Sequence, residues 1–302
     1  MEFTGKIRYS FKNDYMFKAV LQKNPNVLKN LLASLLHLQI NEIQSIDIKN
    51  PIVLGENIDN KAVILDILLV LNGNRQINIE LQVVAQSFWK ERSLTYLCKL
   101  YNQLNVGEEY SEAMKTIHIG ILDFELFPGE EQFYSQNLFM DKITHRIYSD
   151  NLALNVLCLK EIENATQEDR DCGLYLWAKL FAATTWEELM MIAENNDVLK
   201  DAVVTIKQLS EDQRIRLQCE ARRRYEMDWK TMQKKLEAAQ ANAAKAKRDA
   251  VEAKKNETEA KRSAQKAQAL ALETQRLLDE ERENTQKLLR ELELLKRTSD
   301  SQ

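Results

Sequence analysis

Glycine, proline, cysteine and histidine are all scarce in this 302-residue chain, which contains 7, 3, 4 and 3 of them respectively. Few glycines and no glycine-rich phosphate loop disfavour a nucleotide-binding fold. The three histidines are isolated, with no HxH or HExxH motif, and the chain has no nucleophile elbow. The sequence therefore disfavours the catalytic schemes that depend on these motifs.

The cysteines are too far apart in sequence to indicate a shared site, and none forms a CxxC pair: Cys98, Cys158, Cys172 and Cys219. Neither a zinc site nor a disulfide framework is indicated, which fits a reducing cytoplasm. The first 14 residues lack the apolar core of a signal peptide. No apolar run approaches the roughly 18 residues of a membrane span. We therefore expect a cytoplasmic protein that does not enter a membrane.

The charge is distributed unevenly along the chain, although the net charge is only −4. Residues 211–302 carry 22 Lys/Arg and 18 Asp/Glu, which leaves 20 and 28 for residues 1–210, a net charge of −8. Such a field is unfavourable for the approach of a polyanion. Binding to nucleic acid must therefore depend on local basic patches.

Hydrophobic periodicity predicts a mixed α/β domain over residues 1–210. Its elements follow the order α-β-β-β-α-β, with two further extended stretches and short closing helices from about residue 170. The expected helices are 13–38, with a bend possible at Pro25, then 89–104 and several within 172–209. The expected strands are 43–53, 62–71, 76–84, 116–124, 132–140 and 152–160, with a turn at 72–74.

Residues 211–302 form a second region, which contains no glycine or proline and is rich in Ala, Glu, Lys, Gln and Arg. Apolar or small residues recur in a heptad pattern from Tyr225 to Leu295, interrupted at Glu257, Glu281 and two threonines. This pattern predicts a long helix that pairs as a coiled coil. We expect the chain to form a homo-oligomer through it.

Two acidic residues interrupt apolar strands in the first region. Asp66 lies within the run 62–71, and Glu80 lies within 77–83. If the turn is centred on Gly73, Asp66 lies directly opposite Glu80, and Gln82 projects from the same face. Two opposed carboxylates can share a divalent cation. The alternative is that each pairs with Arg or Lys from a neighbouring helix.

The hairpin resembles the PD-(D/E)XK nuclease signature, an acid on one strand followed by (D/E)-x-K on the next. Five segments resemble, more narrowly, the Rpn family of recombination-promoting nucleases, also described as transposases of the PD-(D/E)XK type. These segments are 13–18, 79–82, 88–96, 100–101 and 107–110. The resemblance covers about residues 10–210 and implies a restriction-endonuclease-like core.

The resemblance implies that Asp66, Glu80 and the main-chain carbonyl of Leu81 bind Mg²⁺, with Mn²⁺ as a possible substitute. Asp14 matches an early acid of the family and would orient a second ion or a metal-bound water; alternatively, it caps the first helix. Gln82 occupies the position of the superfamily lysine. It can hydrogen-bond the attacking water but brings no positive charge.

Candidate DNA contacts lie at the start of the helix that follows the second acid, at Lys90, Arg92 and Tyr96. The alternative for Arg92 is a structural ion pair. A second basic group consists of Arg222, Arg223 and Arg224 with Lys230, Lys234 and Lys235. Alternation with acidic residues favours the reading that this group is the solvated flank of a coiled coil.

The leading hypothesis is a Mg²⁺-dependent DNA endonuclease that acts in recombination, transposition or defence. The alternative is a degenerate nuclease fold that binds DNA or protein and is organised by its coiled coil. Retention of Asp66 and Glu80 favours the enzyme, whereas Gln82 and the acidic first region favour the alternative.

Overall fold

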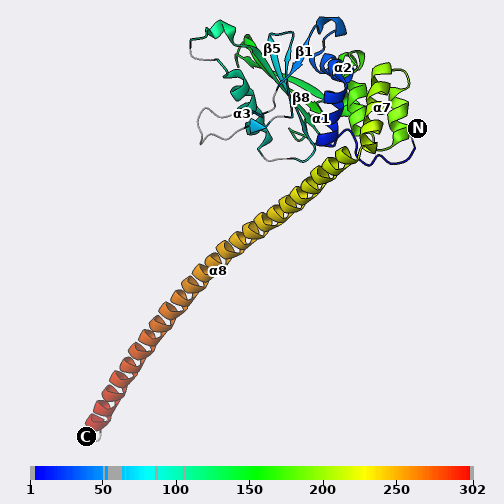
Figure 1. Cartoon of the computed structure of the whole chain (residues 1–302). Coiled ribbons are helices and arrows are strands. Elements are labelled where there is room, and N and C mark those ends of the chain that lie inside the picture. Colours follow the sequence, from blue (N-terminus) through cyan, green and yellow to red (C-terminus); the bar gives the residue numbers. More distant parts are fainter. Residues whose placement is uncertain are drawn as a thin grey trace. The chain divides into compact units, whose positions relative to one another are not determined.

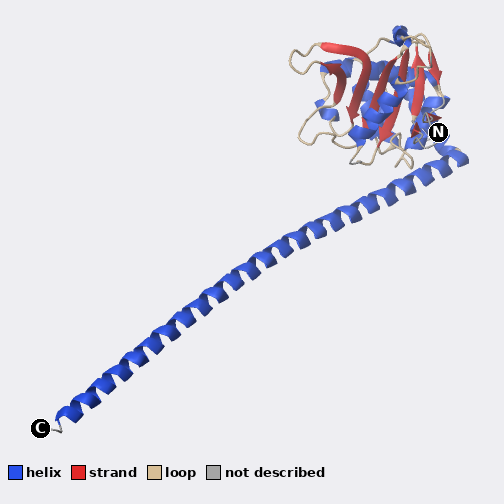
Figure 2. Cartoon of the chain, turned by 90° about the vertical axis from the view of Figure 1, so that its left-hand side faces the viewer, coloured by secondary structure: helices blue, strands red, loops and turns tan. Residues whose placement is uncertain are grey.

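Six strands of the computed structural model form one mixed sheet, in the order β1-β4-β5-β6-β8-β7 (Figure 2). The structure describes residues 4–49, 52–53, 63–64, 66–85, 88–104 and 107–299. The strands are β1 Ile46–Ile48, β4 Ile67–Leu71, β5 Arg75–Gln82, β6 Lys115–Leu122, β7 Tyr134–Met140 and β8 Ile147–Cys158. The predicted mixed sheet with flanking helices is confirmed.

Helices cover this sheet and close the body, as Figure 1 shows. Before the sheet come α1 Asp14–Lys23 and α2 Pro25–Leu36, and α3 Trp89–Tyr101 lies between β5 and β6. The closing helices are α4 Gln167–Asp171, α5 Leu174–Ala182, α6 Trp186–Ala193 and α7 Asp197–Glu211. Asn24 ends α1 and caps α2 with its side chain, so the bend expected at Pro25 separates two helices.

The connections explain the strand directions. A tight turn joins β4 to β5 as an antiparallel hairpin, and β1 pairs antiparallel with β4. Strand β6 is parallel to both β5 and β8. Parallel neighbours need a crossover, and α3 supplies the one between β5 and β6. The helix packs mainly against β6 and β8, on the face where Trp89 meets Leu122 and Val156.

One predicted strand, 62–71, differs from the structure. It is divided into β3 Val63–Ile64 and β4, with Asp66 in a bend between them. Strand β3 pairs with β2 Ile52–Val53 in a separate two-stranded sheet. The division has a physical reason, because a carboxylate is costly in a ladder that is apolar on both faces, and the bend turns it aside. Residues 50–51, 62 and 65 of the predicted strands lie outside the described residues.

The hydrophobic core lies mainly on one face of the sheet, where Ile77 and Ile79 of β5 pack in a single cluster with residues of α1, α2, α5 and α7. The rings of Phe11 and Phe181 stack, with their centroids 4.5 Å apart, and so join the N-terminal segment to α5. On the other face, Trp89 of α3 forms a smaller apolar cluster with Leu122 and Val156. The sheet is therefore covered on both faces.

The long helix that the sequence predicts is present as α8, Gln213–Ser299. Its first turns belong to a compact unit comprising Met1–Lys230, whereas Thr231–Gln302 forms a second unit. The composition changes near residue 210, and α8 begins close to that change, at Gln213. The first compact unit, however, extends to Lys230. No described helix combines the length and the apolar character that crossing a membrane requires.

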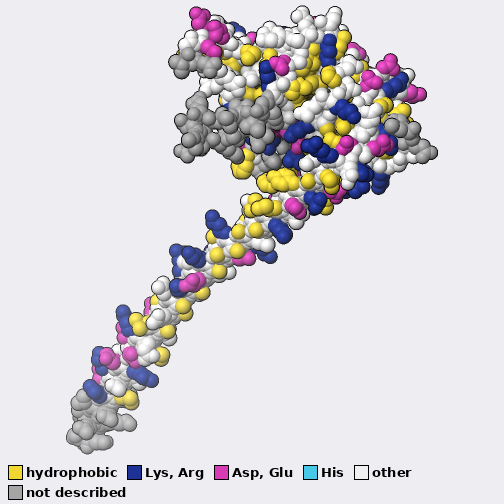
Figure 3. Space-filling view, in the orientation of Figure 1, with side chains coloured by type: hydrophobic (Ala, Val, Ile, Leu, Met, Phe, Trp, Pro, Cys, Tyr) yellow, Lys and Arg dark blue, Asp and Glu magenta, His cyan; other side chains and the backbone are white. Residues whose placement is uncertain are grey.

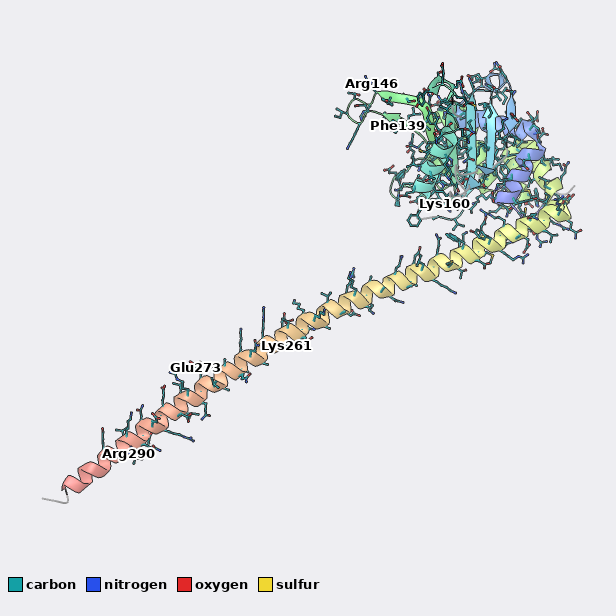
Figure 4. All side chains as sticks on the ribbon, turned by 60° about the vertical axis from the view of Figure 1, so that its left-hand side comes forward. Phe139, Arg146, Lys160, Lys261, Glu273 and Arg290 are labelled. Carbon is teal, nitrogen blue, oxygen red and sulfur yellow. The ribbon has the colours of Figure 1, made fainter. Side chains whose placement is uncertain are left out.

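The second unit is a helix whose side chains are exposed throughout residues 234–291. Lys261, Glu273 and Arg290 project from it in Figure 4. Charged side chains of both signs alternate with hydrophobic ones along this helix in Figure 3. Leu278 and Leu288, which lie on the predicted heptad seam, are 47% and 61% exposed. Pairing through that seam stays a prediction.

Candidate active site

The β4–β5 hairpin sets the position of the two acidic residues. Its ladder pairs Ile67 with Ile79 and Leu71 with Arg75, across a turn in which Asn72 and Gly73 both have positive φ. Residues 72–74 separate the two strands, and Asn74 N donates to Leu71 O at 3.2 Å, so the two positive φ values lie at the centre of a tight β-turn. The last pair of this ladder is Ile67 with Ile79, and Asp66 lies in the bend just outside it, so the directly opposed pair of Asp66 and Glu80 stays a prediction.

Asp66 connects the hairpin to the first helix. Its carboxylate accepts a hydrogen bond of 2.9 Å from the main-chain N–H of Leu81. The Nζ atom of Lys18, on α1, lies 2.8 Å from Asp66 Oδ1 and 3.1 Å from Asp14 Oδ1. The N-cap of α1 is Asn13, whose side chain accepts a hydrogen bond from the main-chain N–H of Met16. Asp14 is thus in the first turn, and Lys18 bridges the two acids.

Glu80 contacts α3, whereas Asp66 contacts α1. One Arg92 nitrogen, Nη2, donates to Glu80 Oε2 at 2.7 Å and to Gln82 Oε1 at 2.8 Å. The Gln82 amide donates in turn to the carbonyl of Val84. Arg92 therefore forms the ion pair that the sequence left as an alternative, and its positive charge lies beside the residue that replaces the superfamily lysine.

Burial, and repulsion from one neighbouring acid in each case, raise the pKa of both carboxylates. Burial, and next the nearby Asp66 carboxylate, raise the pKa of Glu80 to about 8 against the opposing effect of Arg92. Burial, and next Asp14, raise the pKa of Asp66 above its usual range, whereas Lys18 opposes the shift. Buried acids that repel one another are stabilised by a cation between them, so the pair is suited to binding one.

These side chains line one cavity of about 240 Å³. It brings together most of the residues expected from the sequence: Asp14, Asp66, Glu80, Leu81, Gln82, Arg92 and Tyr96. Lys90 is elsewhere, because its ammonium group lies over the ring of Phe127, at 5.1 Å, and lines a different pocket. Positions two apart on a helix point in different directions, which separates Lys90 from Arg92.

Three cavity residues were not assigned to the site from the sequence: Lys18, Arg222 and Tyr225. Lys18 follows Asp14 by one helical turn, and this spacing alone could have identified it. Arg222 and Tyr225 come from α8, and Arg222 Nε lies 3.2 Å from Asp14 Oδ2. The sequence placed Arg222 in a second basic group, but that group is far from the hairpin along the chain, so no local pattern linked it to the two acids.

The donor chemistry of the cavity fits a hard divalent cation, because carboxylate, amide and main-chain oxygens meet there. Throughout the described ranges, no group of three or more His, Cys, Asp or Glu side chains is arranged to hold a metal. Asp66 and Glu80 would therefore need a main-chain or water oxygen to complete the ligand set. The carbonyl of Leu81, between Glu80 and Gln82, is the donor implied by the resemblance.

Comparison with known families gives one match. Residues 11–236 match the family model described as PD-(D/E)XK nuclease family transposase. The match begins just before α1 and ends within the early turns of α8, so it includes every residue that lines the cavity. No curated protein and no solved structure matches the chain.

Proposed function

The chain belongs to the PD-(D/E)XK nuclease family transposases, and from this premise we propose that it is a metal-dependent DNA endonuclease. The observation that carries the proposal is that buried Glu80 and largely buried Asp66 line one cavity with three basic side chains. Recombination, transposition or defence is the proposed biological setting, and the cytoplasm the proposed location.

In the proposed reaction, Asp66, Glu80 and the carbonyl of Leu81 hold Mg²⁺, or Mn²⁺ in its place. A divalent ion bound there would supply Lewis-acid chemistry, lowering the pKa of a water and stabilising charge on the scissile phosphate. Asp14 orients a water or a second ion from the α1 side of the cavity. Both acids bind a cation only when ionised, so their raised pKa values couple metal binding to proton release.

We propose that Arg92 supplies the positive charge that Gln82 lacks. Its guanidinium is held between Glu80 and Gln82, and its charge lies 5.5 Å from the centre of the Tyr96 ring. An arginine in this place can donate to a phosphate oxygen while Gln82 holds the attacking water by hydrogen bonds. Tyr96 contacts the DNA backbone beside it, and Lys90 contacts DNA outside the cavity.

One observation favours a second candidate function, in which the fold binds DNA or protein without cleaving it. Each acid of the cavity already has a basic partner, since Lys18, Arg92 and Arg222 pair with Asp66, Glu80 and Asp14. A metal must compete with these internal cations. In this candidate the coiled coil of α8 organises the modules into a homo-oligomer.

Nicking of supercoiled plasmid in Mg²⁺, Mn²⁺ or chelator tests the proposal. We expect metal-dependent nicking that falls on the order of 10²–10³-fold in Asp66→Asn and in Glu80→Gln, as for loss of a charge-stabilising group at an active site. Asp150→Asn is the matched control, because Asp150 is an exposed acid paired with Lys115, outside the cavity. Equal nicking by wild type and Asp66→Asn contradicts the assignment, and DNA binding without nicking supports the second candidate.

A further inference from the structure

The first turns of α8 are held against the N-terminal segment of the same compact unit (Figure 1). Cys219 is completely buried, and its carbonyl accepts a hydrogen bond of 3.2 Å from the Asn13 side chain. One residue later, Glu220 Oε2 accepts a hydrogen bond of 2.7 Å from the Tyr9 hydroxyl. These contacts fix the rotation of the helix about its axis.

That rotation turns one face of α8 towards the catalytic residues. Arg222 and Tyr225 line the cavity with the acids, whereas Arg223 and Arg224 do not. Arg222 Nε lies 3.2 Å from Asp14 Oδ2 and 3.4 Å from Glu226 Oε1. Its side chain is 34% exposed, so it is both anchored and open to solvent. One of three consecutive arginines is thereby selected by geometry.

The geometry points to Arg222 as a positioning residue for the DNA backbone, and this inference rests on the proposed nuclease function. Both ion pairs run from Nε, which is buried and donates no hydrogen bond within the described part of the chain, at one edge of a planar group that carries four more N–H donors. A guanidinium held at its edge in this way presents a fork that matches two oxygens of a phosphate. The active site therefore includes the start of the C-terminal helix.

Charge balance gives Arg222 a definite task. Residues 1–210 carry a net charge of −8, so DNA approaches this cavity only where basic side chains line it. Three helices each contribute one basic side chain to the cavity: α1 contributes Lys18, α3 contributes Arg92 and α8 contributes Arg222. Figure 3 shows basic side chains on the face of the body next to the start of α8. Arg222 also offsets the charge of Asp14, which lowers the attraction of the cavity for a metal.

The two effects have opposite signs, and this allows a sharp test with Arg222→Gln, Arg222→Lys and the neighbouring control Arg223→Gln in the full chain. Binding to a short duplex is measured against salt in Ca²⁺, Mn²⁺ affinity is measured by calorimetry without DNA, and KM and kcat are measured in Mg²⁺. We expect Arg222→Gln to weaken DNA binding on the order of tenfold. The salt slope should fall by about 1, as for one lost phosphate contact.

Mn²⁺ affinity of Arg222→Gln should stay equal or rise, KM should rise more than kcat falls, and Arg222→Lys should recover part of the DNA affinity. Arg223→Gln should match wild type in each measurement. The inference is overturned if Arg222→Gln and Arg223→Gln have the same DNA affinity and salt slope. Loss of DNA and Mn²⁺ binding together, with a lower melting temperature, also overturns it, because Arg222 would then act only in folding.

The binding measurements separate this inference from the proposed function. If wild type binds DNA without nicking it, the nuclease proposal fails, while the salt slope still reports whether Arg222 contacts a phosphate. If wild type nicks DNA and Arg222→Gln retains wild-type KM and DNA affinity, the inference fails and the nuclease proposal stands.

Discussion

The two faces of β5 are buried to the same extent and are chemically opposite. On one face lie Ile77, Ile79 and Leu81, and on the other lie Gln76, Asn78, Glu80 and Gln82, and all seven are at most 6% exposed. The first face packs into the main hydrophobic cluster. Each side chain of the second face has a specific polar partner: Gln103, His118, Arg92 and the carbonyl of Val84.

The comparison shows that burial has different consequences on the two faces. Burying an apolar side chain of this size stabilises the folded state, on the order of 1.5–3 kcal/mol. A buried polar side chain gains little net stability even when it is paired, but its partners fix its orientation. The apolar face therefore stabilises the fold, and the polar face positions Glu80.

The largest effects come from substituting the adjacent residues Ile79 and Glu80. Ile79→Ala should lower the free energy of unfolding by about 2–5 kcal/mol through lost contacts and a cavity, while the folded fraction keeps its nicking activity. Glu80→Gln should change stability by about 1 kcal/mol or less, because burial and Asp66 raise the pKa of Glu80 and thus disfavour the charge that the amide removes. Urea denaturation beside plasmid nicking checks both, and loss of stability and activity together in each variant would remove the distinction between the faces.

A smaller effect is expected at Gly120, which lies beside Glu80 in the parallel ladder. A Cβ atom there would lie 2.3 Å from a ring carbon of Trp89. Gly120→Ala should therefore cost about 1–3 kcal/mol by overpacking. It should also lower kcat, since Trp89 begins the helix that carries Arg92.

A double-mutant cycle measures this coupling, because Trp89→Phe removes the ring atoms that the new methyl group meets. We expect Gly120→Ala to be less harmful in the Trp89→Phe background, for stability and for kcat alike. Additive effects would show that the polar face is not held in place by this contact.

The last effect is a pH dependence at His118, which is absent at neutral pH. Burial, and next Arg92, lower its pKa to about 3. The unfolded chain binds this proton near pH 6.5, so stability is complete above that pH and falls as the pH drops towards 3. The slope should be at most about 1.4 kcal/mol per pH unit, and His118→Gln should flatten it. Denaturation midpoints between pH 3 and 7 check this, and parallel curves for the two proteins would contradict it.

Local patterns predicted the hairpin well. Residues 72–74 specify a tight turn, and alternation in the strand specifies which face each side chain takes, so the register needed only nearby residues. The bend at Asp66 was not predicted, because the run 62–71 reads as continuous and the contact that turns the carboxylate aside is with Leu81 N. The role of each site residue stays a prediction.

Contacts between distant parts of the chain were beyond reach. Asn13 and Cys219 are 206 positions apart, and no periodicity relates them. The boundary near residue 210 follows composition, which changes where α8 begins, whereas the first compact unit ends at Lys230. Tyr225 begins the predicted heptad seam, but in the structure it belongs to the first unit and lines the cavity. A helix that looks uniform in sequence thus has two environments.

The placement of Arg222 has a consequence for natural variants of the gene. A stop codon at position 231 deletes the second unit and keeps every residue that lines the cavity. A stop codon ten positions earlier, at 221, removes Arg222 and Tyr225 and leaves Asp14 without its α8 partner. Truncation at 231 therefore removes only the exposed helix, whereas truncation at 221 also removes part of the proposed active site.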